Sequence, residues 1–143
     1  MSPVDREIIK RKLAVITRNL NALQRISGLT RHEYESDVFL KKGTERLLQE
    51  LIEAAIDINT HIIVELGGVV PDTYFDAFLQ LGVLRVLPDN LAHSLAPFAG
   101  LRNSLVHEYD VIDDAVVLAS VDGATKLFTE YVRTIKDFID KQS

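Results

Sequence analysis

The 143-residue chain contains no cysteine. This absence excludes disulfide bonds, zinc sites built from thiolates and a cysteine nucleophile. Any chemistry must therefore come from histidine, carboxylate, arginine, tyrosine, serine or threonine side chains.

Long hydrophobic runs are also missing. No apolar run approaches the roughly 20 residues needed to span a bilayer, and the N-terminal stretch SPVDREIIKRK lacks the apolar region of a signal peptide. These features predict a soluble protein of the cytoplasm with no membrane partner. The length and the 47% share of apolar residues predict one domain, residues 1–143, with its own core.

Positive charge is in the minority, since the formal net charge is -5. This balance argues against strong non-specific binding to nucleic acid, which depends on Lys and Arg replacing counterions at phosphates. However, ten of the 16 Lys and Arg residues lie in residues 1–50, with only seven of the 21 Asp and Glu residues. The N-terminal part can therefore still form a local basic surface.

Signals for β-hairpins, repeats and low complexity are absent, and apolar residues recur with the period of an α-helix. A first helix is expected from Pro3 to near Gly28. Its apolar stripe is Ile9, Leu13, Ile16, Leu20 and Leu23. Arg11, Arg18 and Arg25 recur every seven residues, almost opposite that stripe. They form an outward basic ridge, and a solvated face is the more common role of such residues.

Four further helices are expected. One runs from Thr44 to the glycines at 67 and 68, a short one begins at Pro71, one begins at Pro88 and bends at Pro97 and Gly100, and a last one follows the acidic connection YDVIDD. The short helix carries Tyr74, Phe75, Phe78 and Leu79. The predicted fold class is therefore all-α, an antiparallel bundle of four main helices plus a short helix.

Asp57 and His61 lie four residues apart on the predicted helix that begins at Thr44. They are expected to form a structural hydrogen bond more often than part of a metal site, because one Asp-His pair is a weak metal signal. We therefore expect no metal and no cofactor.

The stretch RNSLVHEY, residues 102–109, concentrates groups that move a proton or hold an anion. Asn103 and His107 are four residues apart and share a helical face, whereas Arg102 and His107 differ by about 140° around the axis. Arg102 and His107 therefore converge only if the arginine bends, the helix is distorted, or a second copy supplies the facing partner. The alternative is that Arg102 pairs with acidic neighbours and His107 interacts with the helix C-terminus.

This run resembles the Arg-x4-His-x-Tyr signature of the HEPN superfamily, and in particular its HepT-like toxins. The resemblance extends in order over the segments ERLLQELIEAAIDINTHII, PDTYFDAFLQLGVL and LAPFAGLRNSLVHEYDVID. It implies a helical-bundle ribonuclease that forms a homodimer, so that residues of two protomers line one cleft. It also implies a nucleotidyltransferase antitoxin that adenylates the motif tyrosine. Arg102 and His107 then become the catalytic pair, Asn103 the supporting polar group, and Tyr109 the site of modification.

The chemistry of these side chains is consistent with metal-independent RNA cleavage. Histidine titrates near neutral pH and serves as general base or acid, and the arginine fork matches phosphate oxygens in the transition state. Cleavage then leaves a 2′,3′-cyclic phosphate. Translation-related RNA such as tRNA is the target implied by the resemblance.

A second hypothesis is a non-catalytic subunit. In this case, the domain binds a nucleotide or substrate for a nucleotidyltransferase, Arg102 holds a phosphate, and His107 only supports it. The complete set of Arg102, Asn103, His107 and Tyr109 favours the enzyme, because phosphate binding alone does not require a histidine.

Overall fold

Seven α-helices make up the described part of the chain, which in this computed structural model comprises residues 1–107 and 112–142, the side chain of Val4 excepted. The helices are α1 (Pro3–Leu23), α2 (Arg31–Glu35), α3 (Val38–Glu65), α4 (Tyr74–Val83), α5 (Asp89–Leu95), α6 (Phe98–Val106) and α7 (Asp114–Lys141). No strand occurs in those residues. The predicted all-α fold class is therefore confirmed.

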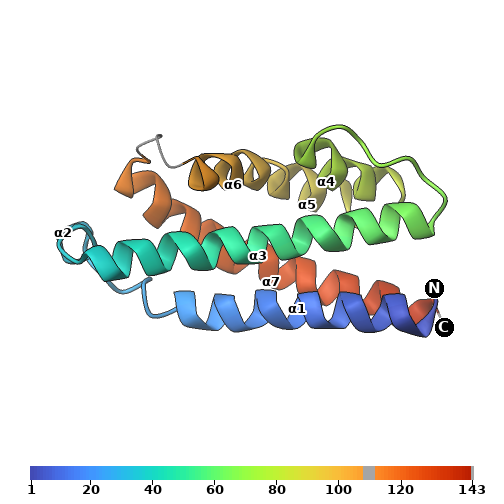
Figure 1. Cartoon of the computed structure of the whole chain (residues 1–143), viewed down its shortest axis with the longest axis horizontal. Coiled ribbons are helices and arrows are strands. Elements are labelled where there is room, and N and C mark those ends of the chain that lie inside the picture. The colour runs from blue at the N-terminus through green and yellow to red at the C-terminus, as the bar shows by residue number, and fades with distance from the viewer. Residues whose placement is uncertain (108–111, 143) are drawn as a thin grey trace.

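The helix α3 is at the centre of the bundle (Figure 1). It packs against α1 on one side and against α4 and α6 on the other, while α7 packs along α1 and also contacts α3 and α5. The helix α1 runs antiparallel to α3 and to α7, and the two ends of the chain lie at the same end of the bundle. Thus α1 and α6 lie on opposite sides of α3.

The core consists of the apolar stripes that the helical period predicts. All five stripe residues of α1 are buried, and Leu51, Ile58 and Ile62 of α3 are completely buried. Aromatic side chains join α4, α6 and α7 through edge-to-face contacts: Phe78 with Tyr131, Phe98 with Phe128, and Phe128 with Tyr131. Within the described ranges, no helix combines the length and the apolar character needed to cross a membrane.

Two helix starts differ from the predictions because other residues provide the cap. The helix α3 begins six residues before Thr44, at Val38, where the Asp37 side chain accepts a hydrogen bond from the backbone N–H of Leu40 at 3.1 Å. Thr44 lies inside the helix and donates its hydroxyl to Leu40 O at 2.7 Å. Likewise, α4 begins at Tyr74 and is capped by Thr73, instead of beginning at Pro71.

The helix expected from Pro88 is divided in two. Ala96 and Pro97 keep right-handed helical backbone angles, but Pro97 has no N–H to continue the i to i−4 hydrogen bonds, and α5 ends before it. The short helix α2 was not predicted. It is stabilised by a capping box between Thr30 and Glu33. The structure therefore has seven helices where the sequence predicted five.

Candidate functional site

The helix α6 carries three of the four predicted site residues at its C-terminal end. Arg102 and Asn103 lie in the last turns, and His107 is the C-terminal cap with an extended backbone (φ -81°, ψ 103°). The His107 N–H donates a hydrogen bond to Asn103 O at 3.3 Å. The side chains of Asn103 and His107 are exposed, so both are accessible to a substrate. The fourth predicted residue, Tyr109, lies outside the described residues.

The Arg102 side chain is held by residues from two other helices. Its Nε lies 3.8 Å from Glu53 Oε1 on α3, and its guanidinium carbon lies 5.3 Å from the centre of the Tyr74 ring on α4. These distances are typical of an ion pair and of a cation–π contact. The Arg102 side chain is only 23% exposed. Thus α3 and α4 together fix a cation at the surface of α6.

The hydrogen-bonding capacity of Arg102 is only partly used. Its Nη1 donates to Asn103 Oδ1 at 3.4 Å, a long hydrogen bond. Its Nε is buried and, among the described residues, has no hydrogen-bond partner, since Glu53 is too distant. A phosphate oxygen near the guanidinium would therefore meet donors that are oriented and largely available.

The structure brings Arg102 and Asn103 together, but it supports neither alternative reading completely. Among the described residues, the carboxylate near Arg102 belongs to Glu53 on α3. His107 lies at the C-terminus of α6, as expected if this histidine interacts with the end of the helix. That His107 of one protomer faces Arg102 of a second protomer remains a prediction.

Glu53 and Tyr74 were not predicted as site residues. Tyr74 and Phe75 were expected on the short helix, and each is 44% exposed. Nothing in the sequence couples Glu53 or Tyr74 to Arg102, because the three side chains come from separate helices.

Asp57 and His61 do not form the hydrogen bond expected from their spacing. Asp57 Oδ2 instead accepts a hydrogen bond from Lys12 Nζ on α1 at 2.9 Å. Among residues 1–107 and 112–142, no three His, Asp or Glu side chains gather closely enough to hold a metal ion. The Lys12–Asp57 pair thus joins α1 to α3.

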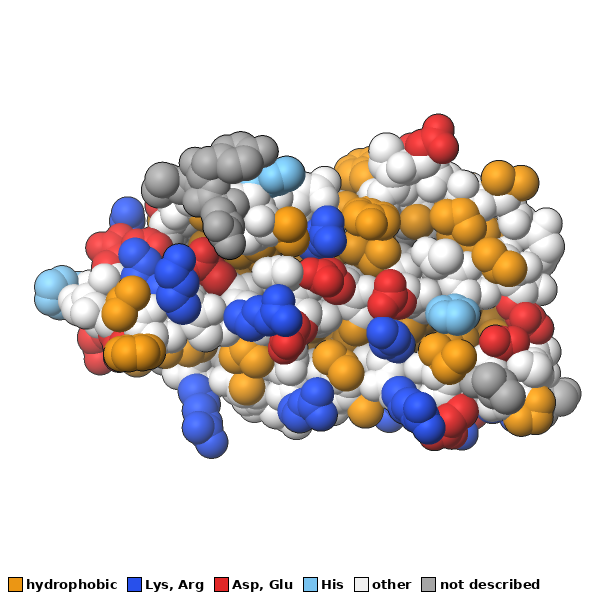
Figure 2. Space-filling model, in the orientation of Figure 1, with side chains coloured by type: hydrophobic (Ala, Val, Ile, Leu, Met, Phe, Trp, Pro, Cys, Tyr) orange, Lys and Arg blue, Asp and Glu red, His pale blue; other side chains and the backbone are white. Residues whose placement is uncertain are grey.

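An exposed apolar patch lies beside Arg102. Hydrophobic side chains gather over α4 and the segment that leads into it from α3 (Figure 2). The apolar patch consists of Val64, Leu66, Val69, Val70, Tyr74, Phe75 and Val83. Val69 is 88% exposed and Val83 is 69% exposed, which is unusual for large apolar residues on a lone domain. The patch and the arginine share Tyr74, so a partner covering the patch would border the site.

The fold and the motif on α6 define the chain as a helical bundle with an Arg-x4-His site, and comparisons with known proteins give the family. Residues 16–135 match the family model "Ribonuclease HepT-like". The chain belongs to the HepT-like ribonuclease family.

Two relatives and a solved structure illustrate this membership. The chain is 39% identical over 139 residues to the tRNA nuclease HepT of Aphanizomenon flos-aquae, covering 97% of this chain and 95% of the relative. It is 28% identical over 130 residues to the mRNA nuclease HepT of Shewanella oneidensis, covering 91% and 97%. The tri-AMPylated HEPN toxin of S. oneidensis, solved in complex with its MNT antitoxin, superposes with a TM-score of 0.82 and 28% identity, covering 96% of this chain and 99% of the toxin.

Proposed function

We propose that this protein is the toxin of a toxin–antitoxin pair, a ribonuclease that cleaves RNA in the cytoplasm without a metal ion and is neutralised by a nucleotidyltransferase antitoxin. The observation that carries this proposal is the oriented guanidinium of Arg102 on the same helix end as His107, in a chain of the HepT-like ribonuclease family. The named tRNA nuclease relative makes tRNA the first substrate to test.

The proposed reaction is transesterification at a phosphodiester. A histidine accepts the proton of the ribose 2′-hydroxyl, the resulting oxygen attacks the adjacent phosphorus, and the bond to the 5′-oxygen breaks as that oxygen receives a proton. Arg102 stabilises the negative charge that accumulates on the phosphate oxygens. Asn103, beside the guanidinium, orients Arg102 or the RNA. The products are a 2′,3′-cyclic phosphate and a free 5′-hydroxyl.

The site is proposed to be completed by a second copy of the chain. On a regular helix, Arg102 and His107 would lie about 140° apart around the axis, so two protomers related by a two-fold axis would bring the arginine of one toward the histidine of the other. The apolar patch next to Arg102 supports this arrangement, because it offers surface that a second protomer buries. A homodimer of this kind has two equivalent clefts or one shared cleft.

The first prediction tests catalysis. His107→Ala and Arg102→Ala should each lower the rate of tRNA cleavage by at least about 10²-fold, because each removes a group that acts in the transition state. The helical circular dichroism spectrum should stay unchanged, since neither side chain belongs to the buried core. The measurement is single-turnover cleavage of total tRNA on denaturing gels, with identification of the product termini.

His32→Ala and Arg133→Ala are the matched controls, because both residues are exposed and lie outside α6. An active His107→Ala protein would contradict the mechanism, and a wild-type protein that binds RNA without cutting it would indicate the non-catalytic subunit. Cleavage should also persist in excess EDTA. Its loss on chelation, with recovery on adding a divalent ion, would contradict metal independence.

The second prediction concerns neutralisation at Tyr109. The solved S. oneidensis toxin is tri-AMPylated, and each added nucleotide carries a negative phosphodiester. Such a group attached two residues after His107 would compete with RNA for Arg102. Co-expression with the nucleotidyltransferase should therefore add AMP mass to Tyr109 and abolish cleavage. Tyr109→Phe should keep most of its activity and remain active on co-expression, whereas modification at another residue would refute this assignment.

A further inference from the structure

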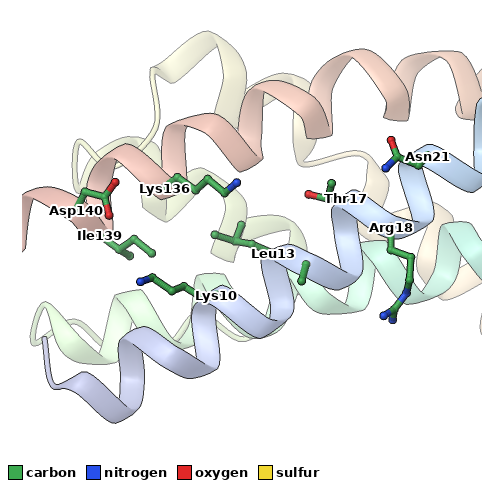
Figure 3. Close-up of a pocket in the computed structure, with 9 residues that line it drawn as sticks. Lys10, Leu13, Thr17, Arg18, Asn21, Lys136, Ile139 and Asp140 are labelled. Carbon is green, nitrogen blue, oxygen red and sulfur yellow. The ribbon is translucent and has the colours of Figure 1, made fainter.

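A groove between α1 and α7 lies on the opposite side of α3 from Arg102. Its volume is about 700 Å³, and its walls are formed by one face of α1 and the C-terminal part of α7 (Figure 3). Leu13 and Ile139, each only 1% exposed, form an apolar floor between the two helices. The polar rim consists of Lys10, Thr17, Arg18, Asn21, Lys136 and Asp140.

The groove carries an excess of positive charge. Lys10 and Arg18 come from α1 and Lys136 from α7, against one carboxylate, that of Asp140. Within the described part of the chain, none of these three cations forms an ion pair. Lys10 and Lys136 therefore direct like charges from two packed helices toward one groove, while the Arg18 guanidinium points away from α7 at the edge of the groove (Figure 3). Together these cations favour an anionic ligand at this face.

Neighbouring cations outside the groove behave differently. Arg11, next to Lys10, lies 3.7 Å from Glu7, and Arg133 of α7 lies 3.7 Å from Glu130. Arg11 also lines a separate hollow with Pro3, Glu7 and Ile8. Of the predicted basic ridge, Arg18 lines the groove and Arg11 lines the separate hollow.

The opposite flank of α1 has the reverse charge. The hollow between α1 and α3 is lined by Glu50, Glu53 and Asp57, together with Lys12, which is already paired with Asp57. Arg18 lies on the border, because it lines both the groove and this hollow. The α7 flank of α1 therefore presents cations without an ion pair among the described residues, whereas each carboxylate on the α3 flank is paired with a cation.

We propose that the groove between α1 and α7 binds the phosphodiester backbone of the RNA substrate at a distance from the cleavage site. Lys10, Arg18 and Lys136 neutralise phosphates, and Thr17 and Asn21 offer hydrogen bonds to phosphate or ribose oxygens. No aromatic residue lines the groove, so bases do not stack there and binding is independent of sequence. This inference rests on the proposed ribonuclease function, since it assigns a second contact for the same substrate.

The position of the groove sets a minimum length for the RNA. Packed helices lie about 8–10 Å apart, so the two steps from α6 across α3 to α1 span about 20 Å. This is a straight-line distance through α3, and a strand on the surface of the protein follows a longer path. A tetranucleotide is therefore too short to contact both places, whereas a strand of about 24 nucleotides reaches both the groove and the cleavage site.

The test compares two triple variants that remove the same charge. The groove variant is Lys10→Gln, Arg18→Gln and Lys136→Gln. The control variant is Arg11→Gln, Arg46→Gln and Arg133→Gln, which removes exposed cations that are paired within their own helices. Both are made with His107→Ala, so that the RNA is not cut. Binding of a fluorescein-labelled single-stranded RNA of about 24 nucleotides is followed by anisotropy between about 50 and 200 mM salt.

The groove variant should bind this RNA at least about tenfold more weakly at low salt than the control variant. Its slope of log affinity against log salt should be smaller by about 2, since each phosphate contact to a single strand contributes about 0.7. With His107 restored, the advantage in kcat/KM of the long RNA over a tetranucleotide should fall toward one in the groove variant only.

Equal affinities and slopes in the two variants would overturn the proposal. So would a groove variant that binds RNA normally but no longer co-purifies with the nucleotidyltransferase, because the groove would then be a protein-docking surface. Failure of the proposed function gives a different result: the wild-type protein leaves tRNA intact, whatever the two variants bind.

Discussion

At the scale of single residues, substitutions of Tyr74 test whether its ring orients Arg102, while Arg102 itself stays unchanged. Replacing the aromatic ring removes a cation–π contact worth about 0.5–1 kcal/mol at a partly exposed position. Tyr74→Leu should therefore lower kcat by about two- to fivefold and change KM little, because the guanidinium is less well positioned when charge develops on the phosphate.

Tyr74→Phe is the matched control for this third prediction, since it keeps the ring 5.3 Å from the guanidinium carbon and removes only the hydroxyl. Steady-state cleavage rates of both variants, measured against RNA concentration, separate kcat from KM. Equal rates for the leucine and phenylalanine variants would show that Tyr74 does not position Arg102. An equal rise of KM in both would indicate that Tyr74 contacts the RNA directly.

The residues of the site differ in how far the sequence reveals them. Arg102, Asn103 and His107 lie within six positions, so their spacing and their resemblance to a family motif suffice to name them. Glu53 and Tyr74 reach Arg102 only because α3 and α4 pack against α6. Helical periodicity predicts which face of each helix is buried, but it does not predict which exposed residues of two helices meet.

At the scale of helices, the contact between α7 and α3 depends on one buried hydroxyl. Tyr131 is fully buried, and its hydroxyl lies 2.6 Å from Asn59 Oδ1 and 3.1 Å from Ala55 O. Burial raises the pKa of Tyr131 well above its ordinary value, so the phenol stays protonated and donates. Tyr131→Phe, the fourth prediction, should lower the free energy of unfolding by about 1–3 kcal/mol, since the buried Asn59 loses a donor.

The control for this prediction is Tyr34→Phe. The Tyr34 ring is equally buried, but among the described residues its hydroxyl has no hydrogen-bond partner of good geometry. Its removal should change the free energy of unfolding by no more than about 0.5 kcal/mol. Urea unfolding followed by circular dichroism measures both variants, and equal destabilisation would contradict the role of the Tyr131 hydroxyl. We also expect one transition for residues 1–143, because the buried side chains form a single cluster.

The helices also show where prediction from sequence succeeds and fails. The stripes of α1 and α3 were predicted because each long helix buries one face along most of its length. The starts of α3 and α4 were wrong because several residues in each stretch are able to cap a helix, and packing selects among them. The division into α5 and α6 was missed because the chain keeps helical angles through Pro97 while losing a hydrogen bond.

At the scale of the whole molecule, the positions of the apolar patch and of the C-terminal end of α6 predict that two protomers share the residues of each catalytic cleft. If each catalytic cleft takes Arg102 from one protomer and His107 from its partner, neither residue needs to be intact in both copies. Arg102→Ala and His107→Ala proteins should each be inactive alone. A heterodimer of the two keeps one cleft in which the histidine of the first protein faces the arginine of the second.

The fifth prediction is therefore that mixing the two inactive proteins restores cleavage. If protomers exchange freely, about half of the dimers in an equal mixture are heterodimers, and each of these keeps one of its two clefts, so the recovered rate should approach about a quarter of the wild-type rate. A mutation in the apolar patch, Val69→Asp, should abolish recovery, because a charge buried in the interface prevents association. Light scattering reports the dimer and gel assays report cleavage. Absence of recovery in mixtures that do form heterodimers would show that each protomer builds its site alone, with Arg102 and His107 meeting on one α6.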